Sequence, residues 1–251
     1  MTTISLIDLD DSIFQAARKC PVGIALSDAA VDKKGVAHSF CTPKQMALLG
    51  LLTGGGIVVP VTARETDGLK RVKIPFTSHA ITSFGAVILT PEGSVEPGWD
   101  DVMRPLCQDA TAVHLECLDF MTREARRLGI DSRSELITDV GMPLYVNTKH
   151  NDGNDFSELT KLRDALLGWM PDGWKIHFNA NNLALLPPHL GKERAVTHYL
   201  RELAPDHSLV VGLGDSFTDL GFMGLCDFAI TPTNSQIFAG FLSGITAPYK
   251  A

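Results

Sequence analysis

The chain has 251 residues, 45% of them hydrophobic, and its 29 acidic against 22 basic residues give a formal charge of −7. This length suits one large domain, or a core domain that carries a smaller one, with enough apolar residues for a buried core. The composition excludes a disordered chain, a collagen-like fibre and a disulfide scaffold. The acidic balance argues against a nucleic-acid partner, because phosphate backbones attract clustered Lys and Arg and the sequence has no such run.

The cysteines and the N-terminal segment indicate a compartment. The five cysteines are odd in number and form no CxxC pair, which favours reduced thiols in the cytoplasm. The segment MTTISLIDLDD carries carboxylates where a signal peptide would be basic and then apolar. The longest uncharged run, residues 45–63, contains GGG and Pro60 and therefore predicts helix, loop and strand rather than a membrane span. We expect a soluble, cytoplasmic protein with no membrane partner.

Short apolar runs predict buried parallel strands, which are hydrophobic on both faces. Three such runs are Ile4–Leu9, Ile57–Val61 and Leu209–Leu213, and a further strand is expected at Phe228–Ile230. Helices are expected at Pro43–Leu52 and after Gly191, where apolar residues recur at helical spacing. Strands that alternate with helices in this way predict a doubly wound α/β core.

The middle of the chain has a different pattern, which predicts an inserted α+β unit. A helix through Leu118–Leu128 is followed by strands at Glu135–Asp139 and Pro143–Thr148. A second helix is expected to start at the N-cap Asp155, with Glu158 completing a capping box. Its expected buried residues are Phe156, Leu159, Leu162, Leu166 and Trp169. Two more strands are expected, at Lys175–Asn179 and Leu183–Leu186. We predict an insert over residues 92–186, which divides the core into residues 1–91 and 187–251.

Polar residues follow each of the three apolar runs. The segments are Asp8–Ser12 (DLDDS), Thr62–Arg64 (TAR) and Gly214–Asp219 (GDSFTD). One such segment alone would be an ordinary turn or helix cap. In an open α/β sheet, however, ligands bind beyond the carboxyl ends of the strands. If the three strands are neighbours, Asp8, Asp10, Thr62 and Asp215 converge there, and three such endings together favour a functional site.

Gathered carboxylates repel one another unless a cation neutralises them. Two or three carboxylates with open water positions describe a Mg²⁺ site that leaves room for phosphate. Lys192, directly after Gly191 at a predicted helix start, adds a positive charge, although alone it would be read as a surface lysine. A hydroxyl, a lysine, a metal ion and a carboxylate nucleophile together fit phosphoryl transfer.

At these residues the sequence resembles the haloacid dehalogenase (HAD) superfamily of phosphatases, in its Mg-dependent branch with an α/β cap between the second and third motifs. That branch includes the Cof-type and sucrose-phosphatase-like enzymes and the phosphomannomutases. Asp8–Ser12 is similar to DxDx(T/S), Thr62 with Arg64 to the second motif, Lys192 to the third, and Gly214–Asp219 to GDSxxD. Departures from the usual residues are Ser12 for Thr, Thr218 for Asn, and Phe84 for Asn in Ile81–Ile88 (ITSFGAVI).

The resemblance implies a fold and a role for each matching residue. The expected fold is a Rossmann-like HAD core with a parallel sheet plus a smaller inserted α+β cap domain. Asp8 is the implied nucleophile, and Asp10 the implied general acid and then base. The implied phosphate-binding residues are Thr62, Ala63, Arg64 and Lys192. Mg²⁺ is the implied cofactor, bound by the Asp8 carboxylate, the Asp10 backbone carbonyl and Asp215, with Asp219 as a further ligand or as a partner that orients Lys192.

The resemblance implies a Mg-dependent phosphatase acting on a small phosphorylated metabolite, for example a sugar phosphate. Two alternatives stay open, a sugar phosphomutase of the same superfamily and a non-catalytic sensor of a phosphate ligand. HLGKE lacks the glycine and hydroxyl residue of a Walker A loop, and GLGDSF is not a GxSxG elbow. Four polar residues of the predicted second hairpin face a substrate or are ordinary turn residues; they are His177, Asn179, Asn181 and Asn182.

Overall fold

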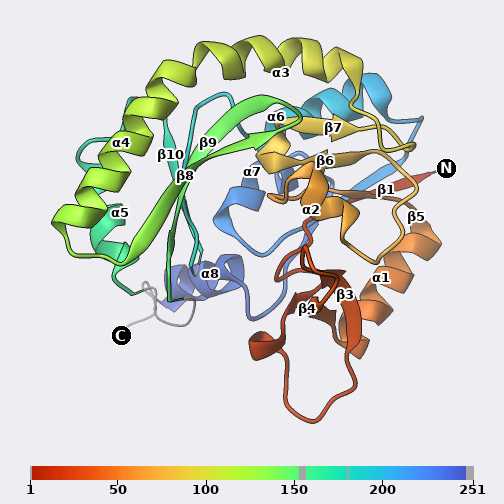
Figure 1. Cartoon of the computed structure of the whole chain (residues 1–251). Coiled ribbons are helices and arrows are strands. Elements are labelled where there is room, and N and C mark those ends of the chain that lie inside the picture. The colour runs from red at the N-terminus through yellow and green to blue at the C-terminus, as the bar shows by residue number, and fades with distance from the viewer. Residues whose placement is uncertain (1, 153–156, 180, 247–251) are drawn as a thin grey trace. The chain divides into compact units, whose positions relative to one another are not determined.

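The computed structural model describes residues 2–152, 157–179 and 181–246. The chain separates into two compact units, Met1–Trp99 with Gly191–Ala251, called the core here, and Asp100–Leu190, called the insert. The core contains a parallel sheet and the insert a separate antiparallel sheet (Figure 1), which confirms the predicted α/β class with an inserted α+β unit. The domain boundaries at 91/92 and 186/187 stay a prediction.

The core is organised around a four-stranded parallel sheet with the strand order β13-β12-β1-β5. Its strands coincide with the predicted apolar runs, and they are β1 (Thr3–Ile7), β5 (Gly56–Pro60), β12 (Leu209–Leu213) and β13 (Phe228–Ile230). Pro60 is the last residue of the edge strand β5, a place where the missing N–H is tolerated. In register, Ile7 pairs with both Pro60 and Leu213, so β1, β5 and β12 end level.

Helices of different lengths join these strands. The core helices are α1 (Pro43–Gly55), α2 (Thr66–Lys70), α6 (Lys192–His198), α7 (Leu220–Met223) and α8 (Gln236–Thr246), with short 3-10 helices η1 (Ala17–Lys19), η2 (Ser83–Gly85) and η4 (Phe217–Asp219). α1 begins as predicted, because Thr42 and Gln45 form a capping box and Pro43 takes the first turn. The helix expected after Gly191 is interrupted, since α6 ends at His198 and a π-helix, η3 (Tyr199–Leu203), follows.

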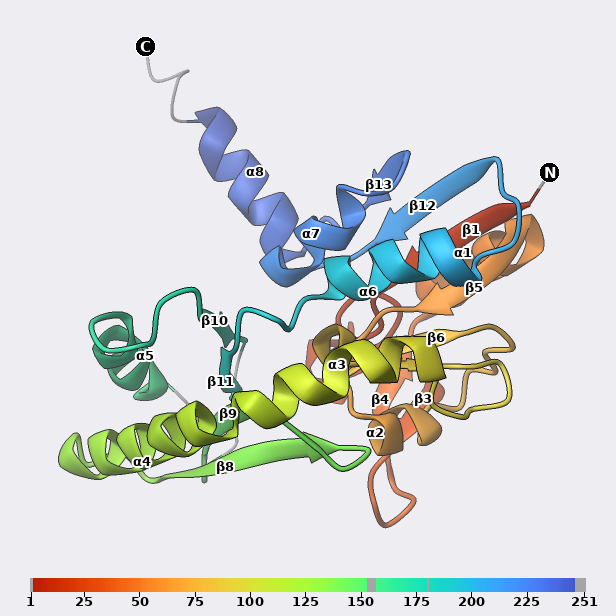
Figure 2. The same ribbon diagram turned by 90° about the horizontal axis from the view of Figure 1, so that it is seen from above.

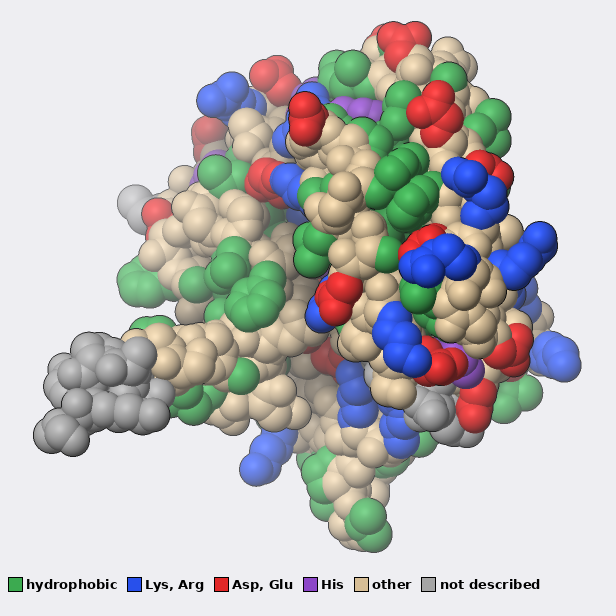
Figure 3. All heavy atoms as spheres, turned by 90° about the vertical axis from the view of Figure 1, so that its left-hand side faces the viewer, with side chains coloured by type: hydrophobic (Ala, Val, Ile, Leu, Met, Phe, Trp, Pro, Cys, Tyr) green, Lys and Arg blue, Asp and Glu red, His purple; other side chains and the backbone are tan. Residues whose placement is uncertain are grey.

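Two antiparallel elements of the core were not predicted. One is a small sheet of β2 (Gln15–Ala16), β4 (Ala37–Cys41) and β3 (Ser27–Val31), whose loop at residues 20–26 exposes Val22, Ile24 and Leu26. Figure 3 shows hydrophobic side chains on the projection at the bottom of that view. The other is the hairpin β6 (Ala80–Thr82) and β7 (Val87–Leu89). The chain reverses there because residues 83, 84 and 85 all have positive φ.

The insert is a four-stranded antiparallel sheet with helices on one face. The strand order is β10-β11-β9-β8, and the strands are β8 (Ser132–Asp139), β9 (Met142–His150), β10 (Lys175–Phe178) and β11 (Leu183–Leu186). α3 (Pro97–Asp109) leads into the insert, and α4 (Thr111–Arg127) lies along β8 and β9 (Figure 2). Side chains such as Met121 and Leu162 pack on Val146 and Leu183 of the sheet and form an apolar core.

The second helix of the insert differs from its prediction. α5 spans Leu159–Leu167, and Glu158 occupies its N-cap without a side-chain cap hydrogen bond. The predicted N-cap Asp155 and the predicted core residue Phe156 lie outside the described residues. Leu159, Leu162 and Leu166 are buried as expected. Trp169 was wrongly predicted to be buried: it is 37% exposed and stacks on Phe120 with ring centroids 3.9 Å apart, because it follows the end of α5.

Candidate active site

The level ends of three core strands bring distant segments to one edge of the sheet. The Asp8 backbone N–H donates to the Leu213 carbonyl at 2.7 Å, and the Val61 N–H donates to the Ile7 carbonyl at 2.7 Å. The segments that begin at Asp8, Val61 and Gly214 therefore leave the sheet together. Parallel strands place their ligand-binding residues at this edge.

A buried amine joins two of the predicted carboxylates. Lys192 Nζ lies 2.7 Å from Asp8 Oδ1 and 2.6 Å from Asp219 Oδ1, and the three side chains are 8% exposed or less. Lys192 is the first residue of α6. Its approach depends on Gly85, where φ is +89° and an added Cβ would lie 2.5 Å from the Gly191 carbonyl oxygen. The tight η2 turn thus lets the start of α6 come close to the strand ends.

Asp219 is held by hydrogen bonds on both oxygens. While Oδ1 accepts from Lys192, Oδ2 accepts from the backbone N–H groups of Asp215 and Ser216 and from the Ser216 hydroxyl, at 2.9 to 3.1 Å. Burial by itself would raise the pKa of Asp219, but the Lys192 ammonium and these donors hold that pKa below its usual value. Asp219 therefore stays ionised and orients the Lys192 amine.

For both Asp8 and Lys192, burial disfavours the charged form of the side chain, whereas the opposite charge of the partner favours it. Burial raises the pKa of Asp8 well above its usual range, against the effect of the Lys192 ammonium, and the nearby charges of Asp219 and Asp215 raise it further. The second Asp8 oxygen accepts a hydrogen bond from Ser12 Oγ at 3.2 Å. Burial alone would lower the pKa of Lys192, but Asp219 and Asp8 raise it above its ordinary value. The amine is therefore a fixed positive charge.

Three carboxylates form a candidate metal site. Asp8, Asp215 and Asp219 are buried, and one oxygen of each lies within 4.8 Å of the others. Burial raises the pKa of Asp215 to about 7, and the nearby Asp219 and Asp11 carboxylates add to this rise. An all-oxygen donor set of this kind fits Mg²⁺. The Asp10 carboxylate, from the predicted metal-binding segment, lies outside this group.

Hydrogen bonds from the β6–β7 hairpin hold the segment Thr62–Arg64. Thr62 is buried, its backbone N–H donates to the Ile81 carbonyl at 2.8 Å, and its Oγ1 accepts from the Arg64 N–H at 3.1 Å. The Arg64 carbonyl accepts from the Ser83 N–H at 2.8 Å. Ala63, between them, is half-buried. The Thr62 hydroxyl is thus placed at the sheet edge where the carboxylates gather.

Asp10 and Arg64 form a separate, two-point ion pair. Arg64 Nε donates to Asp10 Oδ2 at 2.6 Å, and the Arg64 NH2 group donates to Asp10 Oδ1 at 2.8 Å. The guanidinium also lies over the Phe14 ring, 5.0 Å from its centroid, and contacts Ser39 Oγ at 3.4 Å. The sequence grouped Arg64 with the phosphate-binding residues, whereas the structure places its guanidinium on Asp10. The sequence predicted no role for Phe14 or Ser39. Phe14 lies in a loop and Ser39 in a short strand, and neither belongs to a recognisable motif.

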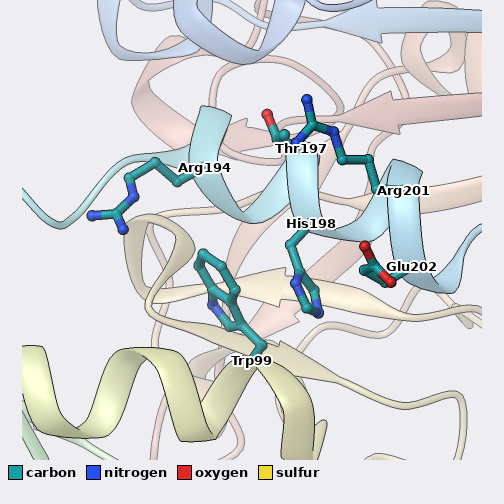
Figure 4. Close-up of a pocket in the computed structure, with 6 residues that line it drawn as sticks. All are labelled: Trp99, Arg194, Thr197, His198, Arg201 and Glu202. Atoms are coloured by element: carbon teal, nitrogen blue, oxygen red, sulfur yellow. The ribbon is translucent and has the colours of Figure 1, made fainter.

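One pocket of the core contains none of the predicted site residues. It has a volume of about 310 Å³ and is lined by Trp99 and one face of α6 and η3 (Figure 4): Arg194, Thr197, His198, Arg201 and Glu202. The rings of Trp99 and His198 lie side by side with centroids 5.0 Å apart.

In the insert, Asn181 bonds the backbone of His150 through both ends of its amide, at 2.6 and 2.9 Å. This contact gives Asn181 a structural role in the insert. Among the described residues, no helix has the length and apolar character needed to cross a membrane.

The fold is similar to that of several solved structures. No protein-family model and no curated protein sequence matches the chain. A sucrose-phosphatase from Synechocystis, solved with sucrose and phosphate, matches with a TM-score of 0.55 at 15% identity and covers 100% of both chains. The C-terminal domain of trehalose-6-phosphate phosphatase from C. albicans matches with a TM-score of 0.53 at 12% identity, over 89% of this chain and 73% of that one. An IMP-bound IMP-nucleotidase from Plasmodium falciparum matches with a TM-score of 0.59 at 10% identity, over 98% of this chain and 68% of that one.

These similarities extend over nearly the full chain and include both the core and the insert. The chain therefore has the fold of the HAD-like phosphatases, a parallel α/β core with an inserted antiparallel unit, as the four motifs led us to expect. At identities of 10 to 15%, this similarity describes the fold.

Proposed function

We propose that the protein is a Mg²⁺-dependent phosphatase that hydrolyses a small phosphorylated metabolite through an aspartyl-phosphate on Asp8. The observation that carries this proposal is the buried Lys192 amine, which is shared between Asp8 and Asp219 beside the three-carboxylate group. Buried charges of this kind cost free energy and are typical of catalytic sites. The HAD-like phosphatase fold supports the same chemistry.

The proposed reaction has two displacements at phosphorus. First, an Asp8 oxygen forms a bond to phosphorus, the ester P–O bond breaks, and the leaving oxygen takes a proton from Asp10. Then a water oxygen attacks phosphorus, its proton passes to Asp10, and the bond to Asp8 breaks, which restores the carboxylate and releases inorganic phosphate. Lys192 and the Thr62 hydroxyl offset charge on the phosphoryl oxygens.

The carboxylates Asp8, Asp215 and Asp219 would hold the metal ion, together with the backbone carbonyl of Asp10. When bound, Mg²⁺ supplies positive charge that favours the ionised carboxylates and neutralises the phosphoryl group. Asp8 needs this help because burial raises its pKa, and only its ionised form attacks phosphorus. Asp219 also serves to keep the Lys192 amine in place.

For the substrate, we propose a class of compounds and no single metabolite. The names of the three similar structures refer to different compounds. One names trehalose-6-phosphate, which is a sugar phosphate, another names sucrose, and the third names the nucleotide IMP. We expect a small metabolite with a phosphate monoester, with sugar phosphates as the first choice.

The five cysteines are free, and burial raises the pKa of Cys41, Cys107 and Cys117 to about 11. These unpaired thiols support a reducing compartment such as the cytoplasm.

The direct test is phosphate release from a panel of sugar phosphates and nucleotides, with and without Mg²⁺. We expect turnover of at least one sugar phosphate, loss of turnover with a chelator, and a fall on the order of 10⁴-fold or more in Asp8→Asn. Asp164→Asn, at an exposed ion pair of the insert, is the matched control and should keep full activity. Equal turnover by Asp8→Asn and the unchanged protein would contradict the proposal. Activity that needs a bisphosphate activator and releases no phosphate would indicate the phosphomutase alternative instead.

A further inference from the structure

The two carboxylates of the DxD segment, Asp8 and Asp10, have different surroundings. The Asp8 side chain is 8% exposed and bonds to Lys192 and Ser12. The Asp10 side chain is 49% exposed, and both of its oxygens accept from Arg64. One carboxylate is therefore buried beside the other candidate metal ligands, whereas the other is half exposed and paired with Arg64.

Arg64 is fixed on every side that the structure describes. Its guanidinium rests over the fully buried Phe14 ring and touches the buried hydroxyl of Ser39. Its backbone N–H and carbonyl are bonded to Thr62 and Ser83, and its side chain is only 15% exposed. A guanidinium held in this way has lost its rotamer freedom already, so it does not behave as a surface arm that reaches for a ligand.

We propose that Arg64 is the positioning residue for Asp10, an inference that rests on the proposed phosphatase function. The paired Nε and NH2 contacts fix the plane of the carboxylate as well as its place, which a single contact cannot do. The Asp10 side chain as a whole is 49% exposed, which leaves it accessible to the reacting oxygens. Arg64 thus keeps Asp10 oriented for the two proton transfers described above, to the leaving oxygen and from the attacking water.

The test compares two esters whose leaving groups differ in their need for a proton. p-Nitrophenyl phosphate releases a stable phenolate without protonation, whereas an alkyl ester such as the best sugar phosphate of the panel needs a general acid. The variants are Arg64→Gln, Arg64→Lys, which keeps the charge but not the two-point contact, and the control Arg127→Gln. Arg127 makes the same kind of two-point pair with Glu124, at 2.8 and 2.6 Å, on the exposed surface of α4.

We expect kcat for the alkyl ester to fall by about 10²- to 10⁴-fold in both Arg64 variants, with KM within about 3-fold of the unchanged protein. With p-nitrophenyl phosphate, the first turnover should persist as a burst of about one phenolate per enzyme molecule, because that step needs no acid. Steady-state turnover of this ester should still fall, because activation of water also requires Asp10. Arg127→Gln should behave like the unchanged protein with both esters.

Three outcomes would overturn the inference. A rise in KM for both esters, with kcat kept and with rescue by Arg64→Lys, would make Arg64 a phosphate ligand instead. Alkyl-ester turnover by Arg64→Gln at the full rate would show that Asp10 needs no positioning. Loss of the phenolate burst in both Arg64 variants, with unchanged melting temperatures, would place Arg64 in the first displacement itself. If Arg64→Gln melts early, Arg64→Lys carries the comparison. Failure of the proposed function is distinct, because the unchanged protein would then release phosphate from neither ester.

Discussion

The core buries a group of charged side chains, whereas the ion pairs on the helices of the insert are exposed. In the core, the Lys192 amine lies between Asp8 and Asp219 with 3% of its side chain exposed, and Asp215 is buried beside them. Taking such charges out of water costs several kcal/mol per ion, which only close partners offset. The core therefore holds this one group of buried charges where the strands end, at a cost in stability.

The insert places charge on helix surfaces. Asp119 with Arg123 on α4 and Glu158 with Lys161 at α5 are exposed pairs at helical spacing. Pairs of this type contribute little, because water and salt screen them. The hydrophobic cluster of the insert, by contrast, contains no ion pair among its described residues and packs Met121 with Val146 and Leu183. The comparison teaches that the position of a charge, not the number of charges, indicates where chemistry takes place.

The largest test of this contrast removes one amine from each unit. Lys192→Met leaves Asp8 and Asp219 buried without their cation, so we expect a loss of about 3–5 kcal/mol in the unfolding free energy of the metal-free protein. Lys161→Met, in an exposed pair at 3.3 Å, should leave the stability unchanged within error. Urea denaturation with a chelator present measures both. Equal losses in the two variants would remove the distinction between the units.

A second test uses pH in the metal-free protein. The folded state holds a proton on Asp215 up to about pH 7, whereas the unfolded chain releases it near 3.8, so the stabilisation from this proton is full below pH 3.8 and is lost as the pH rises to 7. The two values correspond to an upper limit of about 4 kcal/mol. We expect Mg²⁺ to cancel this loss and Asp215→Asn to lack it. A pH slope in Asp215→Asn as steep as in the unchanged protein would contradict the assignment.

The insert has its own, smaller pH dependence. His114 is fully buried, with its ring edge-on to Trp174 at 5.3 Å, and burial lowers the pKa of this histidine. Because the unfolded chain takes up the proton near pH 6.5 and the folded state does so only at lower pH, stability falls as the pH drops below 6.5. The loss is at most about 1.4 kcal/mol per pH unit. His114→Leu should remove it, as thermal melts from pH 7 to pH 5 can show. Acid sensitivity that persists in His114→Leu would assign the effect to another group.

The smallest expected effect concerns the β8–β9 turn. Val140 has a φ of +44° and Gly141 a φ of +78°, the pattern of a two-residue hairpin turn that favours Asn-Gly. Val is strained in this region of φ, whereas Asn tolerates it. Val140→Asn should therefore stabilise the insert by about 1 kcal/mol and raise the melting temperature by a few degrees, without any change in core chemistry. Val140→Ala is the control, and a Val140→Asn variant that melts below it would refute this account.

The sequence predicts most of the parallel core and part of the site. The inner strand Leu209–Leu213 is an unbroken apolar run and has the same bounds in the sequence and in the structure. The edge strand Phe228–Ile230 also keeps its predicted bounds, although its side chains are exposed or half-buried. The convergence of Asp8 and Asp215 follows from the rule for strand ends. Lys192, 184 positions from Asp8 along the chain, could be linked to it only through a family resemblance.

Other features could not be predicted, for identifiable physical reasons. The small sheet at residues 15–41 has a two-residue strand and register shifts between Asp28 and Val31, so its side chains do not alternate clearly. The η2 turn places Ser83 and Phe84 at positive φ, a conformation that these residue types seldom adopt. The pair between Arg64 and Asp10 joins residues 54 positions apart. Only the folded backbone determines that their side chains meet.

The enclosure of Lys192 also bears on chemical modification of the protein. An amine reacts with acylating reagents through the lone pair of its unprotonated form. Lys192 stays protonated because Asp219 and Asp8 raise its pKa. The reagent also cannot reach it, since only 3% of its side chain is exposed. Lys33 and Lys34, in contrast, lie exposed in the turn between β3 and β4. The protein can therefore be attached to a support or a dye through its surface lysines while the amine among the carboxylates is left intact.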